Sequence, residues 1–67
     1  MKPTLLATAP TIERIEAMVR KFYGNPSMLM LIESGQLVWE VHTGRGFTGC
    51  VVRFCHGRYR FEKAAQP

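Results

Sequence analysis

The sequence lacks any long hydrophobic run. No stretch approaches the roughly 18 consecutive apolar residues that a membrane-spanning helix needs. The apolar stretch near the N-terminus is shorter than the roughly 7–15 residues of a signal-peptide core, and Pro10 interrupts it. We therefore expect a cytoplasmic protein without membrane contact, in a compartment where thiols stay reduced.

Internal repeats and low-complexity segments are also absent. With 67 residues, of which 46% are hydrophobic and 21% charged, the composition is that of one globular domain. A domain of this size buries only about 60% of its extended-chain surface, so its core is marginal without a partner. We expect residues 1–10 to form a flexible N-terminal arm, residues 11–63 a single α+β domain and residues 64–67 a frayed C-terminus.

Acidic residues are scarce. Five of them face nine Lys and Arg residues, which gives a formal net charge of +4. Such an excess permits nucleic acid, an anionic surface or an acidic protein as partner, and it does not choose among them.

A helix is predicted directly after Pro10. Thr11 can cap its first turn by accepting a hydrogen bond from a backbone amide. Gly24 and Pro26 end it, because glycine accepts a left-handed conformation and proline cannot continue a helix. Apolar residues between these limits recur at helical spacing and form one stripe, which comprises Ile12, Ile15, Met18, Val19 and Phe22.

The rest of the chain predicts four β-strands joined by short turns. Turn sequences occur at Ser34-Gly35, Gly44-Arg45-Gly46 and His56-Gly57, and histidine tolerates the left-handed conformation better than most residues. An alternative joins the last two strands into one long strand bulged at Gly57. The expected fold is one N-terminal helix packed on a four-stranded antiparallel meander.

The turn lengths set a register, and the register sorts side chains onto two faces. A two-residue turn at Ser34-Gly35 pairs Glu33 with Gln36, and the later turns continue the pattern. The face expected against the helix holds Met28, Met30, Ile32, Leu37, Trp39, Val41, Cys50, Val52, Phe54, Tyr59 and Phe61. The opposite face holds Leu29, Leu31, Glu33, Gln36, Val38, Glu40, His42, Val51, Arg53, Cys55, Arg58, Arg60 and Glu62.

This opposite face has an apolar centre, formed by Leu29, Leu31, Val38 and Val51. A contiguous exposed apolar patch usually marks an interface, and the first strand is an unprotected apolar edge. Both features favour a homodimer or another protein partner. The alternative is that the N-terminal arm folds back over this face.

The two Cys and two His residues do not predict a metal site. Their spacing differs from that of structural zinc sites, and the register points Cys50 inward and Cys55 outward. The same directions disfavour a disulfide. A thiol enzyme using Cys55 with His42 or His56 is conceivable, but neighbouring strand residues point to opposite faces unless the turn bends them together. We expect no enzyme activity and no cofactor.

Aromatic residues can serve as stacking platforms for nucleic-acid bases. The register instead places Trp39, Tyr59 and Phe61 among core residues. Phe47 follows an Arg-Gly turn, where it is either exposed or tucked under the sheet.

Basic residues carry the most specific functional signal. Arginine is preferred where phosphate or carboxylate is recognised by a forked contact. The expected phosphate contacts of a homodimeric nucleic-acid-binding or regulatory protein are Arg45, Arg53, Arg58, Arg60 and Lys63. Two alternatives stay open: the arginines pair with Glu33, Glu40 or Glu62, or they form the rim of a protein-interaction surface or inhibitor.

Overall fold

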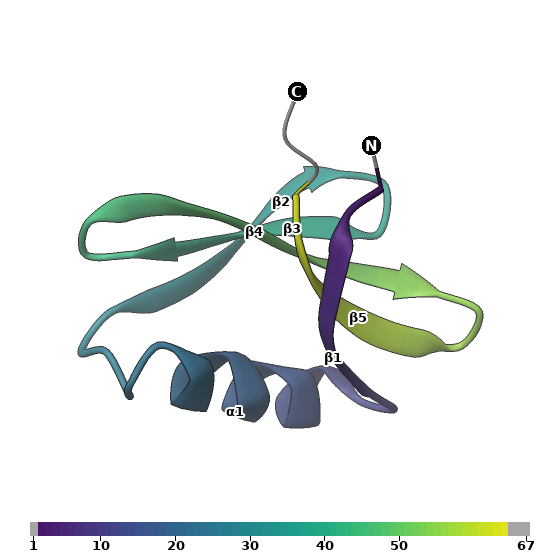
Figure 1. Cartoon of the computed structure of the whole chain (residues 1–67), viewed down its shortest axis with the longest axis horizontal. Helices are drawn as coiled ribbons and strands as arrows, with labels where there is room; N and C mark the ends of the chain where they lie inside the picture. Colours follow the sequence, from purple (N-terminus) through teal and green to yellow (C-terminus); the bar gives the residue numbers. More distant parts are fainter. Residues whose placement is uncertain (1, 65–67) are drawn as a thin grey trace.

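The computed structural model describes residues 2–64 as one helix laid against a five-stranded antiparallel sheet (Figure 1). The spatial order of the strands is β1-β5-β4-β3-β2. The α+β class with an antiparallel sheet is confirmed, but the sheet has five strands rather than four. Of the predicted frayed C-terminus, residues 65–67 lie outside the described residues. The elements are β1 (Thr4–Ala9), α1 (Ile12–Phe22), β2 (Leu29–Gly35), β3 (Val38–Thr43), β4 (Gly46–Cys55) and β5 (Arg58–Lys63).

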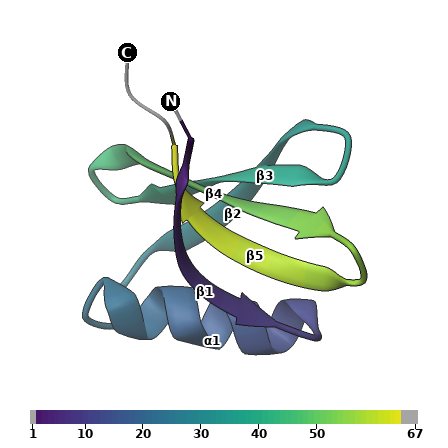
Figure 2. The same cartoon turned by 45° about the vertical axis from the view of Figure 1, so that its right-hand side comes forward.

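The fifth strand comes from the segment predicted as an arm. β1 pairs with β5, with Ala9 opposite Tyr59 and Thr8 opposite Arg60, and a register shift lies between Leu5 and Ala7. Figure 2 shows β1 running along β5 above the helix. β1 and β5 are about fifty residues apart in the sequence, so no turn sequence between them could predict the pairing.

Helix α1 begins and ends as predicted. Thr11 is its N-cap, and the Arg14 backbone amide donates to Thr11 Oγ1 at 3.2 Å. Gly24 takes the left-handed conformation just beyond the helix, with φ of 73°. Ile15 and Val19 are completely buried, whereas Met18 and Phe22 at the edges of the apolar stripe are largely exposed.

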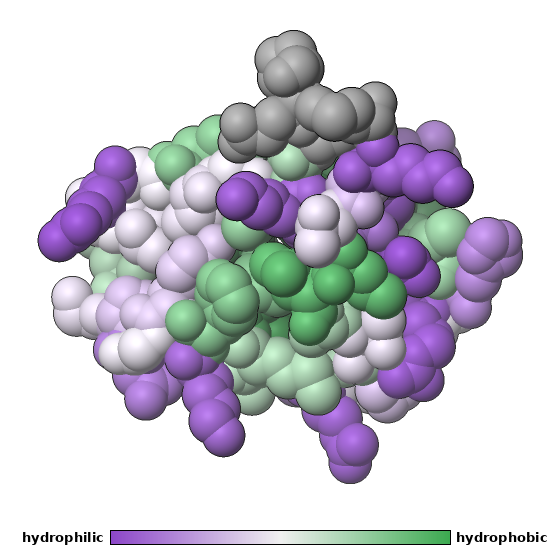
Figure 3. Space-filling model, in the orientation of Figure 1, coloured by the Kyte–Doolittle hydropathy of each residue, from purple (hydrophilic) through white to green (hydrophobic). Residues whose placement is uncertain are grey.

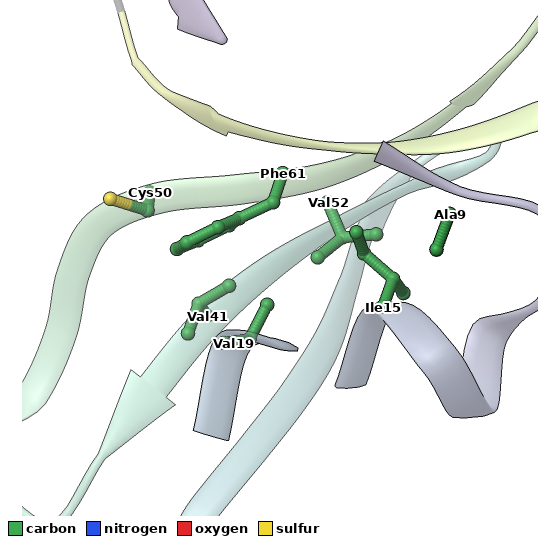
Figure 4. Packing of buried hydrophobic residues seen from close by; sticks show 7 residues of the cluster. All are labelled: Ala9, Ile15, Val19, Val41, Cys50, Val52 and Phe61. Atoms are coloured by element: carbon green, nitrogen blue, oxygen red, sulfur yellow. The ribbon is translucent and has the colours of Figure 1, made fainter. Parts of the chain in front are cut away.

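The core lies between α1 and one face of the sheet (Figure 4). Ile15 and Val19 point from the helix toward the sheet, where burial stabilises the fold by about 1.5–3 kcal/mol for each side chain. Half-buried Tyr23 and Trp39 pack against the buried residues of this core. The pKa of the Tyr23 phenol is raised by burial and by the neighbouring Cys50 thiol, so the folded protein favours the neutral phenol. The buried cluster comprises Ala9, Ile15, Val19, Val41, Cys50, Val52 and Phe61.

The predicted register holds for the last three strands. Trp39 pairs with Val52, and the β4–β5 pairing also follows the predicted positions. The chain reverses at His56-Gly57, with φ of 53° and 76°, so β4 and β5 are two strands and not one bulged strand. The structure also contains a register shift that was not predicted, in the β3–β4 pair between Glu40 and His42.

The predicted register is wrong for β2. The chain turns at Gln36 and Leu37 instead of Ser34-Gly35, so Gly35 pairs with Val38 and Leu31 with Val41. This displacement is an odd number of residues, and it therefore exchanges the two faces of β2. Leu37, predicted in the core, sits in the turn with φ of 59° and is largely exposed.

Residues 28–32 explain this error. All five are apolar, so both faces of the strand offer residues for burial and the alternation carries no information. In the structure the helix-facing positions belong to Leu29 and Leu31, which pack against the core. Met28, Met30 and Ile32, predicted to be buried, are exposed.

The surface seen in the view of Figure 1 is hydrophobic where β1 and β5 pass above α1, with hydrophilic side chains around it (Figure 3). The Cα atoms span 30 × 29 × 19 Å. Among the described residues, no helix is long and apolar enough to cross a membrane.

Candidate nucleic-acid interface

The sheet face turned away from α1, here called the outer face, carries the candidate site. Strand pairing places its side chains in cross-strand rows, because residues of one face lie opposite each other. One row runs from Val38 through Arg53 and Arg60 to Thr8. The next row runs from Ile32 through Glu40, Val51 and Glu62 to Leu5.

Arg53 and Arg60 are directly opposite each other, an arrangement that like charges alone would destabilise. Glu62 compensates for it. Arg60 Nε donates to Glu62 Oε2 at 2.9 Å, and Arg53 Nε lies 3.4 Å from Glu62 Oε1. Glu62 is only 4% exposed, whereas the side chains of Arg53 and Arg60 are 47% and 38% exposed.

Both of these contacts use the Nε atom of the arginine. The two terminal nitrogens of each guanidinium are therefore left for other acceptors, and the fork geometry of arginine suits phosphate. A single buried carboxylate thus holds Arg60 by a charged hydrogen bond and Arg53 by a longer ion pair without a hydrogen bond, and a net positive charge remains at the surface.

A third arginine joins them at the β4–β5 hairpin. Arg58 is exposed and pairs with Cys55, and its Nη2 donates to Thr8 Oγ1 on β1 at 3.3 Å. We call Arg53, Arg58 and Arg60 the arginine cluster. With Glu62 included, the cluster carries a formal charge of +2, from three arginines and one glutamate.

Arg45 and Lys63, also predicted as phosphate contacts, are not brought to this cluster. Arg45 lies at the tip of the β3–β4 hairpin, and Figure 1 shows the two hairpin tips on opposite sides of the molecule. Lys63 pairs with Cys50, and the alternation of β5 places it on the helix-facing side of the sheet.

The predicted apolar patch also changes its members. Leu29 and Leu31 face the helix, because the β2 register differs, and they pack against the core. Val38 and Val51 stay on the outer face and are half-buried. We call the outer-face part on β2, β3 and the first six residues of β4 the apolar half; it comprises Met30, Ile32, Val38, Phe47 and Val51.

His42 and Glu40 form a polar pair within the apolar half. His42 Nε2 donates a hydrogen bond to Glu40 Oε1 at 3.0 Å. The His42 ring also packs on Phe47, with ring centroids 5.3 Å apart and planes inclined by 33°. Phe47 is 50% exposed, which decides between its two predicted positions.

The thiols are placed mostly as predicted. Both cysteines are free, Cys50 is buried and Cys55 is half-buried. The His56 turn, however, brings the imidazole Nδ1 within 3.2 Å of Cys55 Sγ, although adjacent residues were expected to diverge. The described residues contain no group of three potential metal ligands and enclose no pocket.

Sequence reasoning missed Thr8, because β1 was not predicted. Glu62 was one of three carboxylates considered as arginine partners, and the register alone could not single it out. A glutamate between two outward-facing arginines of the same hairpin was the available signal. No family model matches this chain, and no curated protein or solved structure matches it either.

Proposed function

We propose that this protein is a small cytoplasmic nucleic-acid-binding module that contacts phosphates through the arginine cluster. The observation that carries the proposal is the double ion pair of buried Glu62 with Arg53 and Arg60. Arginines held in place lose less side-chain entropy on binding than free ones. Arg58, tied to Thr8, extends the same positive surface.

The test is fluorescence anisotropy with labelled DNA and RNA, single-stranded and duplex, over a range of salt concentrations. The variant R53Q/R58Q keeps the closer Arg60–Glu62 pair but removes two positive charges. We expect it to weaken binding by about tenfold or more at low salt. The slope of log affinity against log salt should fall by about 1.4 on single strands, because two phosphate contacts are lost.

The matched control is R14Q/K21Q. It removes the same charge from exposed positions of α1, away from the outer face. Equal losses in both variants would show that only net charge matters and would contradict the assigned surface. Absence of binding at low salt would refute the function and direct attention to a protein partner of the apolar half.

We also propose that the module is a homodimer joined along β2. This strand pairs with β3, and no other described strand pairs with its second edge. Its residues 29–32 carry no charge and no proline, the devices that normally protect an open edge. Met30 and Ile32 on this edge strand are 46% and 42% exposed.

The substitution Ile32→Lys places a charge on this edge without disturbing the buried core. We expect it to convert a dimer into a monomer, measured by sedimentation velocity at micromolar concentration. Leu37→Lys adds the same charge at an equally exposed turn position and should leave the dimer intact. A wild-type protein that is monomeric throughout the concentration range would contradict the proposal.

A further inference from the structure

The outer face presents two surfaces of different chemistry side by side. The arginine cluster lies on β5 and the last part of β4, and the apolar half lies on β2, β3 and the first six residues of β4. Along β3 the His42 position and the Val38 position, which pairs with Arg53, are four residues apart, or about 14 Å. A ligand that spans both surfaces must therefore offer anionic and flat apolar groups within this distance.

The pair of rings at the end of the apolar half is suited to a flat group. His42 supports one side of Phe47, and its own ring is held by the hydrogen bond to Glu40. Half of the Phe47 surface remains exposed. An exposed aromatic ring with a fixed support is the arrangement on which nucleic-acid bases stack, whatever their sequence.

The charged side chains also distinguish the apolar half from the arginine cluster. Glu40 is an acid within the apolar half, and it disfavours phosphate there. The arginine cluster attracts phosphate at the other end. The face therefore separates a place for bases from a place for phosphates.

A duplex does not match this division, because its bases are stacked inside and its phosphates line the outside. A single strand exposes both. We propose that the ligand is single-stranded nucleic acid, with a base stacked on Phe47 over His42 and its backbone at the arginine cluster. This inference rests on the proposed function and specifies its ligand.

The experiment compares a labelled oligothymidylate of about 12 nucleotides with the same strand annealed to its complement, by fluorescence anisotropy. We expect tighter binding of the single strand. Phe47→Ala should weaken that binding by roughly 5- to 150-fold without altering its salt slope, and should leave the duplex affinity within about twofold. Phe47→Trp keeps a flat ring and should preserve binding.

Met30→Ala is the matched control, since Met30 is similarly exposed and lies opposite His42 on the same face. Because Met30 also lies on the edge strand of the proposed dimer, sedimentation velocity checks that this variant has the oligomeric state of the wild type. Equal losses in Phe47→Ala and Met30→Ala would overturn stacking in favour of general apolar contact. Equal affinity for both probes, with Phe47→Ala unchanged, would overturn the inference while R53Q/R58Q still tests phosphate binding. Circular dichroism of each variant checks the fold, and the Phe47→Trp result remains informative if Phe47→Ala unfolds.

Discussion

Replacing Phe61 by alanine is expected to lower the free energy of unfolding by about 3–5 kcal/mol. Phe61 is 1% exposed. It lies on β5, which has β1 on one side and β4 on the other. Phe22 and Tyr23 contact its ring edge-on, at centroid distances of 5.2 and 6.1 Å. Deletion of the ring removes its burial and these contacts together, and leaves a cavity.

This loss is large relative to the total free energy of unfolding of the domain. A chain of this length has a total stability of about 3–10 kcal/mol, so the expected loss is about a third of the total at the upper end of this range and all of it at the lower end. Urea titration followed by the fluorescence of Trp39 measures the loss. One fixed protein concentration is used, because the proposed dimer would add a concentration-dependent contribution to stability. Phe61→Leu provides a milder variant that stays within the measurable range.

Phe47→Ala is the control, because the same residue type is removed from an exposed position. Its expected cost is below about 1 kcal/mol. If the two variants lost equal stability, the core would not lie where the structure puts it. The comparison also shows that the binding test with Phe47→Ala uses a folded protein.

Prediction from sequence succeeded where a turn signal and an alternating pattern agreed. His56-Gly57 fixed the β4–β5 hairpin, and the strands beside it alternate clearly, so Val52 and Phe61 were assigned to the core correctly. Thr11 and Gly24 marked the ends of the helix for equally local reasons.

Prediction failed where the physical cause was not local. The β1 strand depends on a partner at the far end of the chain, and the β2 register depends on which apolar face of the strand packs against the buried cluster. The turn itself misled, since Leu37 adopts a left-handed conformation that disfavours a branched side chain. Packing of Leu29 and Leu31 offsets that cost, and no local signal reveals it.

The candidate site shows the same division. Arg53, Arg58 and Arg60 lie on one face, as predicted, because the β4–β5 register was predicted correctly. Arg45 was included because it lies at a hairpin tip and Lys63 because it follows the last strand, and the structure places both away from the arginine cluster.

Replacing Glu62 by glutamine is the second substitution with a large expected effect. Both carboxylate oxygens of Glu62 face Nε atoms of arginines, at 2.9 and 3.4 Å. Glutamine offers one acceptor oxygen and one NH2 donor, so one arginine would meet a donor. We expect a loss of about 1–3 kcal/mol in the free energy of unfolding, because the group is buried.

Glu16→Gln is the control for this loss. Glu16 forms an exposed ion pair with Arg20 one helical turn away, so its replacement should cost at most about 0.5 kcal/mol. Arg60→Gln completes a double-mutant cycle with Glu62→Gln, and a coupling below about 0.5 kcal/mol would contradict the ion pair.

The same substitution distinguishes damage to the fold from a change at the site. Glu62→Gln removes a negative charge beside the arginine cluster, so phosphate is attracted more strongly by the charge that remains. At low salt, well below the unfolding temperature, we expect single-stranded affinity to rise severalfold, since one charge contributes about 1 kcal/mol at 4 Å in water. General damage would lower stability and affinity together. Lower stability with higher affinity would therefore show that the added net charge outweighs the loss of fixed arginine positions, whereas lower affinity in the folded variant would show that Glu62 acts mainly by positioning Arg53 and Arg60. An unchanged affinity would contradict the placement of phosphate beside Glu62.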